Sequence, residues 1–301
     1  MTKETLTVDY INTEVKNNAN EFIDFCENNY RNQIYEIVKN VKNSNGAIHF
    51  VLIAGPSSSG KTTSSKILAN MLKAEGYTAL AISLDDFFVE RHETPMWDDG
   101  EYNYETADAI DWVLFSKCMK GLLDGNPVFL PTYNFATGHK EFFGETIMKE
   151  KTIFVVEGLH ALNPIIDNYI PKRKSFKVYI ETNSDIKLNN ELYIENDSVR
   201  LYRRIIRDLF TRSTSVEKTL YLWRKVIIGE SLYIDPFIDT ADFTVNTFHP
   251  YELCVYKTLF CELKSSSSLL EEFEKKLMVF ENLQKTVVPK NSVLQEFIPQ
   301  N

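Results

Sequence analysis

Eight consecutive residues of this chain, GPSSSGKT at 55–62, have the types and spacing that bind the phosphates of a nucleotide. Glycines at both ends let the backbone bend until successive N–H groups point at phosphate oxygens. Lys61 would reach the β- and γ-phosphates, and the Thr62 hydroxyl would ligate Mg²⁺. The sequence therefore predicts binding of ATP (or GTP) with Mg²⁺. The predicted nucleotide-binding residues are Gly55, Ser57, Ser58, Ser59, Gly60, Lys61, Thr62 and Thr63.

Acidic residues follow two further apolar segments. Asp85 and Asp86 come after residues 78–84, and Glu157 comes after 152–156. In an open parallel sheet the ligand site lies beyond the carboxyl ends of the strands, so we expect these carboxylates near the γ-phosphate. There a carboxylate can accept the proton of an attacking hydroxyl or hold a water bound to magnesium. A simpler interpretation is that they cap turns or helices.

Arginines recur along one predicted helix, at about 199–212. Arg200, Arg204 and Arg207 fall at i, i+4 and i+7, which places them on one helix face. Guanidinium groups in such a row can hold a transferring phosphate. The alternative is a solvated face that forms ion pairs with Asp208 and Glu195.

The elements that position these residues alternate along the chain. Apolar runs at 48–54, 78–84, 152–156, 176–180 and 243–246 predict strands, and a helix is expected at 62–75. Such alternation predicts an α/β fold, a doubly wound parallel sheet with helices on both faces, as in P-loop NTPases. Helical periodicity also predicts a leading segment at 13–42 and a helix at about 269–284.

Composition excludes several functional classes. The chain has 301 residues, 44% of them hydrophobic, and a formal net charge of −9. An acidic surface repels nucleic acid, so we expect no nucleic-acid partner. The sequence lacks a signal peptide and a run of about 18 apolar residues, so we expect a cytoplasmic protein without a membrane partner. The oligomeric state is left open, a homo-oligomer included.

Six motifs, taken in order, resemble the uridine kinase and phosphoribulokinase family of P-loop kinases, and its uridine (nucleoside) kinase branch in particular. They are GPSSSGKTT at 55–63, SLDDFF at 83–88, YNYETADAID at 102–111, PTYNFATGHK at 131–140, EGLHAL at 157–162 and RLYRRIIRD at 200–208. This resemblance covers about 48–257, and the end of the chain, VPKNSVLQEFI at 288–298, is also similar to that of longer bacterial nucleoside kinases. It implies an N-terminal helical segment at 1–44, a kinase domain at 45–263 with an arginine-bearing helical lid at about 198–235, and a C-terminal helical tail at 264–301.

The resemblance also implies a role for individual residues. Asp85 would be the general base, with Lys61 and Arg207 as further catalytic residues. Thr62 and Glu157 would serve the metal, and Arg207 and Arg212 would face the nucleotide phosphates. The implied substrate-binding residues are Asp85, Tyr104, Glu105, Tyr133, Phe135, His139 and Arg204.

The expected reaction is therefore Mg·ATP-dependent phosphorylation of the 5′-hydroxyl of a nucleoside, with uridine or cytidine as substrate. Two departures from the family pattern bear on specificity. Glu105 replaces an aspartate that binds ribose, and Gly138 stands where relatives carry a histidine that reads the pyrimidine edge. The alternatives are a kinase for another small alcohol, such as a sugar phosphate or pantothenate, and a regulatory NTP-binding switch. The second lacks support, since the chain has neither an NKxD nor an LSGGQ motif.

Overall fold

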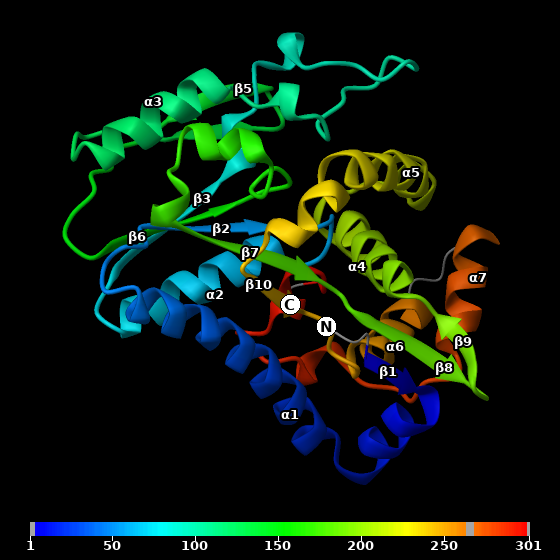
Figure 1. Ribbon diagram of the computed structural model, residues 1–301. Coiled ribbons are helices and arrows are strands. Elements are labelled where there is room, and N and C mark those ends of the chain that lie inside the picture. Colours follow the sequence, from blue (N-terminus) through cyan, green and yellow to red (C-terminus); the bar gives the residue numbers. More distant parts are fainter. Residues whose placement is uncertain (1–3, 263–267, 300–301) are drawn as a thin grey trace.

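The computed structural model describes residues 4–262 and 268–299, and its centre is a five-stranded sheet (Figure 1). The strands are β2 (Phe50–Ala54), β3 (Thr78–Ser83), β6 (Thr152–Glu157), β7 (Ser175–Glu181) and β10 (Phe243–Asn246). They lie in the order β10-β7-β2-β6-β3, and every neighbouring pair is parallel. The predicted α/β fold with a parallel sheet is confirmed.

Strand side chains alternate between two cores, one on each face of the sheet. In β2, Val51 and Ile53 belong to the core that contains α1 (Val8–Asn43) and α2 (Lys61–Ala74). Phe50, Leu52 and Ala54 belong to the other core, with α3 (Trp112–Leu123). Figure 1 shows α1 and α2 below the sheet and α3 above it. The sheet is therefore covered on both faces, as expected, and its carboxyl edge is left for the site.

Two helices stand beyond that carboxyl edge. They are α4 (Asn196–Thr211), which carries the arginines, and α5 (Val216–Tyr233). Before them, β8 (Ser184–Leu188) and β9 (Glu191–Ile194) join the amino-terminal strand β1 (Glu4–Thr7) in a small sheet that periodicity did not predict. A hairpin of β4 (Pro131–Asn134) and β5 (His139–Phe142) borders the site on the other side.

The terminal helices differ from the expected ranges. Helix α1 begins at Val8 and has a kink at Asn18, whose φ and ψ are −160° and 84°. Helix α7 (Ser268–Leu277) follows α6 (Glu252–Glu262) and ends seven residues before 284. The chain turns there because the Asn12 side chain of α1 donates to the Val279 carbonyl and accepts from the Glu281 amide. Residues 264–267 and 300–301 of the expected tail lie outside the described residues.

Short 3-10 helices connect several elements. They span Leu84–Phe87, Arg91–Glu93, Ala107–Ala109, Pro164–Asn168, Lys172–Lys174, Asp235–Thr240, Lys285–Val287 and Val293–Glu296.

In the ranges 4–262 and 268–299, no helix is both long and apolar enough to cross a membrane. The domain boundaries stay a prediction, but α1 and the end of the chain share one core with the sheet.

Candidate active site

Residues 55–62, the phosphate loop, connect β2 to α2. Gly60 has a φ of +91°, a left-handed conformation that favours glycine, and it is the N-cap residue directly before α2. Gly55 lies so close to β7 that an added Cβ would be 2.1 Å from the Ile180 carbonyl oxygen. The loop therefore directs the first amides of α2 outward, and helix amino-terminal amides attract anions.

Acidic and basic side chains from α4 and α5 hold this loop. The Ser57 amide donates to Glu230 of α5 at 2.7 Å, and Arg200 pairs with the same carboxylate at 2.8 Å. Arg200 also donates to the Ser57 carbonyl at 3.2 Å, and Arg204 donates to the Ser57 hydroxyl at 2.8 Å. Arg200 thus supports the loop from the side rather than forming part of a row that faces phosphate.

Arg203 is a loop-supporting residue that sequence reasoning missed. It is fully buried and forms two 2.8 Å contacts with the two carboxylate oxygens of Glu252. Its guanidinium also donates to the Ser58 carbonyl of the loop and to Thr247. The Arg203 side chain points from α4 toward Glu252 of α6, and this position in the core explains why it is not exposed to solvent.

Thr62 and Glu157 meet at the end of the sheet, as the sequence predicted from the strand ends. The Thr62 hydroxyl donates to Glu157 at 3.1 Å, and the Ser83 hydroxyl donates to the same oxygen at 2.9 Å. Hydroxyl and carboxylate oxygens are the donors that Mg²⁺ accepts, and Mg²⁺ commonly needs only one or two from protein beside nucleotide phosphates. The residues therefore fit the expected metal.

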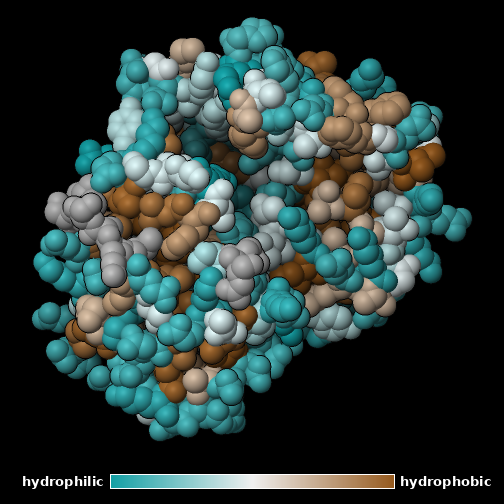
Figure 2. Space-filling model, turned by 180° about the vertical axis from the view of Figure 1, so that it is seen from behind, coloured by the Kyte–Doolittle hydropathy of each residue, from teal (hydrophilic) through white to brown (hydrophobic). Residues whose placement is uncertain are grey.

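Asp85 lies in the 3-10 helix that follows β3, with its side chain exposed to solvent although much of the protein surrounds it. Desolvation raises the pKa of its carboxyl, and the charges of Lys61 and Arg212 oppose that rise. The neighbouring Asp86 points elsewhere and accepts a hydrogen bond from the Tyr133 amide at 3.1 Å. Of the two aspartates, Asp85 is thus the one that is available to a substrate. Figure 2 shows the surface hollowed in its upper middle part.

The remaining arginines of α4 and its end gather around one carboxylate. Arg204, Arg207 and Arg212 lie 3.4, 2.9 and 3.7 Å from Asp208. Arg204 and Arg207 are buried, whereas the Arg212 side chain is 57% exposed. The ion pairs with Asp208 that the alternative interpretation expected are present, but the arginine face is not solvated. Buried guanidiniums near the loop can act on phosphate with little screening.

Three of the expected acceptor-site residues, Tyr104, Tyr133 and Phe135, form one group with Phe88. Aromatic rings of Phe88, Tyr104, Tyr133 and Phe135 pack edge to face or tilted, with centroid distances from 5.0 Å to 6.4 Å. Phe135 leaves 57% of its surface exposed, whereas Tyr133 is buried. An exposed aromatic face beside Asp85 and Asp86 is suited to a flat ring.

Glu105 follows Tyr104 of this aromatic group and packs against α5. An added Cβ at Gly229 of α5 would lie 2.5 Å from the Glu105 Cβ, so only glycine lets the two elements approach this closely. Glu105 as a whole residue is half-buried, and desolvation raises the pKa of its carboxyl to about 7, while the Arg204 charge lowers it. Glu105 therefore changes charge near neutral pH.

A pH dependence of stability follows for Glu105. Folding raises the pKa of the Glu105 carboxyl, so protonation of this group stabilises the folded state. This contribution is fully present below the ordinary pKa of 4.5 and is lost as the pH rises to about 7. Glu105→Gln should therefore match wild type near pH 4.5 and exceed its free energy of unfolding by roughly 1–2 kcal/mol at pH 8. Urea unfolding across this range measures it, with the exposed Glu150→Gln as control. A difference independent of pH would contradict the expectation.

His139 and Gly138 depart from the expected arrangement of the acceptor site. His139 is exposed on β5 and contacts Glu90 at 2.6 Å instead of the aromatic rings. Gly138 has a φ of +80°, and an added Cβ would lie 2.7 Å from Arg91. Arg91 thus fills the space beside Gly138 and donates to the Phe135 and Ala136 carbonyls.

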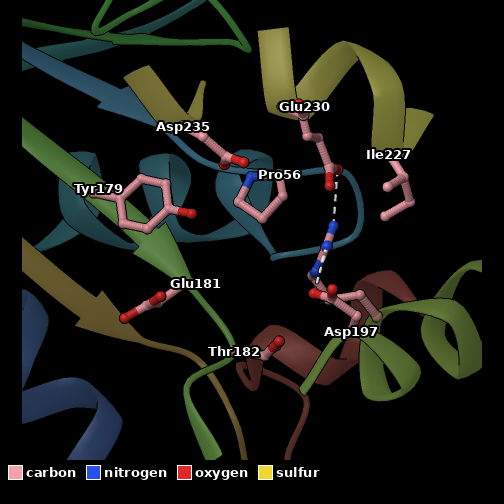
Figure 3. A pocket seen from close by; sticks show the side chains of 10 residues that line it. Pro56, Tyr179, Glu181, Thr182, Asp197, Ile227, Glu230 and Asp235 are labelled. Atoms are coloured by element: carbon pink, nitrogen blue, oxygen red, sulfur yellow. Dashed lines mark hydrogen bonds and ion pairs between the residues drawn. The ribbon is translucent and has the colours of Figure 1, made fainter. Parts of the chain in front are cut away.

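A cavity of about 240 Å³ lies on another side of the phosphate loop (Figure 3). It is lined mainly by polar residues of β7, α4, α5 and the 3-10 helix that follows α5, among them Asp197, Glu230 and Asp235. None of the residues predicted for substrate, nucleotide or metal lines it. The Arg200 ion pairs with Glu230 and Asp197 form one wall, so this cavity belongs to the loop's support.

Comparison with known proteins decides the class. The model of the Phosphoribulokinase / Uridine kinase family matches residues 50–252, which include every site residue predicted above. The chain belongs to this family. The motif resemblance is thus confirmed, and the chain is a kinase, a phosphotransferase that acts on an alcohol group.

Two sequence relatives named as uridine kinases support the same family. A uridine kinase from Macrococcus caseolyticus is 28% identical over 195 residues, 64% of this chain and 85% of that protein. Uridine kinase-like protein 5 from Arabidopsis thaliana is 25% identical over 194 residues, 64% of this chain but only 38% of that protein. A solved structure of a possible uridine kinase from Bacillus stearothermophilus aligns with a TM-score of 0.46 and 17% identity, over 72% of this chain and 98% of that one.

Proposed function

We propose that this kinase transfers the γ-phosphoryl group of ATP to the 5′-hydroxyl of a nucleoside, with uridine or cytidine as substrate. The observation that carries the proposal is the exposed Asp85, which feels the charge of Lys61 and lies in the 3-10 helix that leads from β3 to Phe88 of the aromatic group. Family membership and relatives named uridine kinase support it. The product is the nucleoside monophosphate, and the other product is ADP.

Each residue has a separate role in the proposed reaction. Asp85 accepts the proton of the 5′-hydroxyl as the oxygen attacks, since a base must lie within reach of the proton it removes. Lys61, Arg207 and Arg212 hold negative charge on the transferring group. The phosphate loop and the following Thr63 bind the triphosphate. Mg²⁺, held by Thr62 and Glu157, would neutralise charge that develops on the phosphate oxygens.

The acceptor is positioned by the aromatic group and by two charged residues. The base rests against the exposed ring of Phe135, with Tyr133 packed against that ring, and the ribose hydroxyls donate to Glu105 or accept from Arg204. Glu105 can receive such hydrogen bonds best when ionised, that is above its pKa of about 7. In place of the family's histidine, Arg91 supplies donors at the base edge, and a base carbonyl is the acceptor that such donors fit.

A nucleoside panel tests this function. We expect ADP release with Mg·ATP to require a nucleoside, to be fast with uridine and cytidine, and to be at background with adenosine and guanosine. A coupled assay of ADP at saturating ATP measures it. The opposite outcome, activity on a sugar phosphate or pantothenate and none on any nucleoside, would move the assignment to another alcohol.

A further inference from the structure

Residues 288–298, near the end of the described range, lie against the phosphate loop. Val293 approaches Gly60 so closely that a Cβ on this glycine would be 2.6 Å from a Val293 methyl carbon. We call these residues the C-terminal segment. They lie outside 50–252, the range that the family model matches, so family membership assigns them no role.

One carboxylate of the C-terminal segment binds the start of α2. Glu296 Oε2 accepts from the Thr63 hydroxyl at 2.7 Å and from the Thr63 amide at 3.3 Å. The Thr63 amide is one of the first N–H groups of α2, which lack carbonyl partners within the helix and bind anions. Thr63 is also a residue that the sequence assigns to nucleotide phosphate. A side chain of the protein thus occupies donors expected for the ligand.

We propose that Glu296 is a further residue of the nucleotide site, and that it sets nucleotide affinity by competing with phosphate for Thr63. The inference rests on the proposed use of ATP at the phosphate loop. Two anions cannot share one amide and one hydroxyl without strong repulsion, which is largest where water is scarce. Phosphate therefore binds Thr63 only after the Glu296 carboxylate has released it.

The competition needs only the side chain to move, because the C-terminal segment is anchored elsewhere. Asn291 accepts from Arg31 of α1 at 2.5 Å. Val293, Leu294 and Phe297 are buried, and the Phe297 ring lies 4.9 Å from the Arg203 guanidinium. The charge of Glu296 also attracts the Arg212 guanidinium, as does that of Asp85.

Binding of Mg·ADP, measured by titration calorimetry, tests the inference. We expect Glu296→Gln to bind Mg·ADP about tenfold more tightly than wild type, because the charge that holds Thr63 is gone while the shape is kept. Glu296→Ala, which cannot reach Thr63, should gain at least as much. The matched control is Glu271→Gln, which removes one exposed charge from α7 and should leave the affinity unchanged.

The outcomes separate this inference from the proposed function. Equal or weaker binding by both Glu296 variants, beside clear binding by wild type, would overturn the competition and leave the kinase assignment intact. An absence of Mg·ADP binding in wild type and in both variants would overturn the nucleotide site and the inference with it. Tighter binding by Glu271→Gln of the same size would show a general charge effect and would also overturn the role of Glu296.

Discussion

Asp85→Asn is expected to lower turnover by roughly a hundred- to ten-thousand-fold, the range that a general base contributes. The side chain keeps its size and exposure, but the amide cannot accept the hydroxyl proton. Binding of Mg·ADP should remain, since Asp85 is not part of the phosphate loop. Steady-state kinetics with uridine and calorimetry with Mg·ADP measure the two expectations separately.

The adjacent aspartate provides the matched control. Asp86 accepts from the Tyr133 amide through one oxygen, and the carbonyl oxygen of asparagine can accept the same bond. Asp86→Asn should therefore retain most of the wild-type turnover. Near-normal turnover of Asp85→Asn, or an equal loss in both variants, would remove Asp85 as the base.

Arg203→Met is expected to cause the largest loss of stability. The substitution leaves the Glu252 carboxylate buried without its ion pair, which costs about 3–5 kcal/mol of the free energy of unfolding. It also removes the hydrogen bond from Arg203 to the Ser58 carbonyl, so the phosphate loop loses support. Urea unfolding at pH 7 measures the loss, and the exposed Arg173→Met is the control.

A second variant separates the ion pair from simple packing. In Arg203→Met with Glu252→Leu both charges are absent, so the double variant should recover part of the stability that the single variant loses. A change below about 1 kcal/mol in Arg203→Met would show that the buried pair contributes no more than an exposed one.

Local sequence patterns predicted the central features of the fold and site. The run GPSSSGKT links β2 to the start of α2. Its conformation depends on residues close in sequence, namely its own glycines and the strand before it, and was therefore predictable. The meeting of Thr62 and Glu157 followed from a general property, that parallel strands end at one edge of a sheet. The two strand ends are far apart in sequence, but topology brings them together.

Residues whose roles depend on contacts between distant segments were not predictable. The i, i+4, i+7 spacing left Arg203 outside the predicted arginine face, and no sequence pattern showed that it points at Glu252 in the core. Glu230 reaches the phosphate loop from α5, and Glu296 of the C-terminal segment reaches Thr63 of α2. Arg91 had only an indirect signal, the missing side chain at Gly138.

The short strands illustrate the same limit. The amino-terminal strand β1 pairs with β8, although about 180 residues separate them, and both are too short and too polar for an alternating pattern to stand out. The end of α7 was placed too late because Asn12, a residue of α1, fixes the turn around Val279 and Glu281.

The position of the new phosphate on the product tests the central claim most directly. Purified protein, Mg·ATP and uridine are incubated together, and the product is examined by phosphorus and proton nuclear magnetic resonance. We predict a single monophosphate whose phosphorus couples to the two 5′ protons of the ribose. Phosphate on a 2′- or 3′-oxygen, or release of inorganic phosphate with uridine unchanged, would contradict the account.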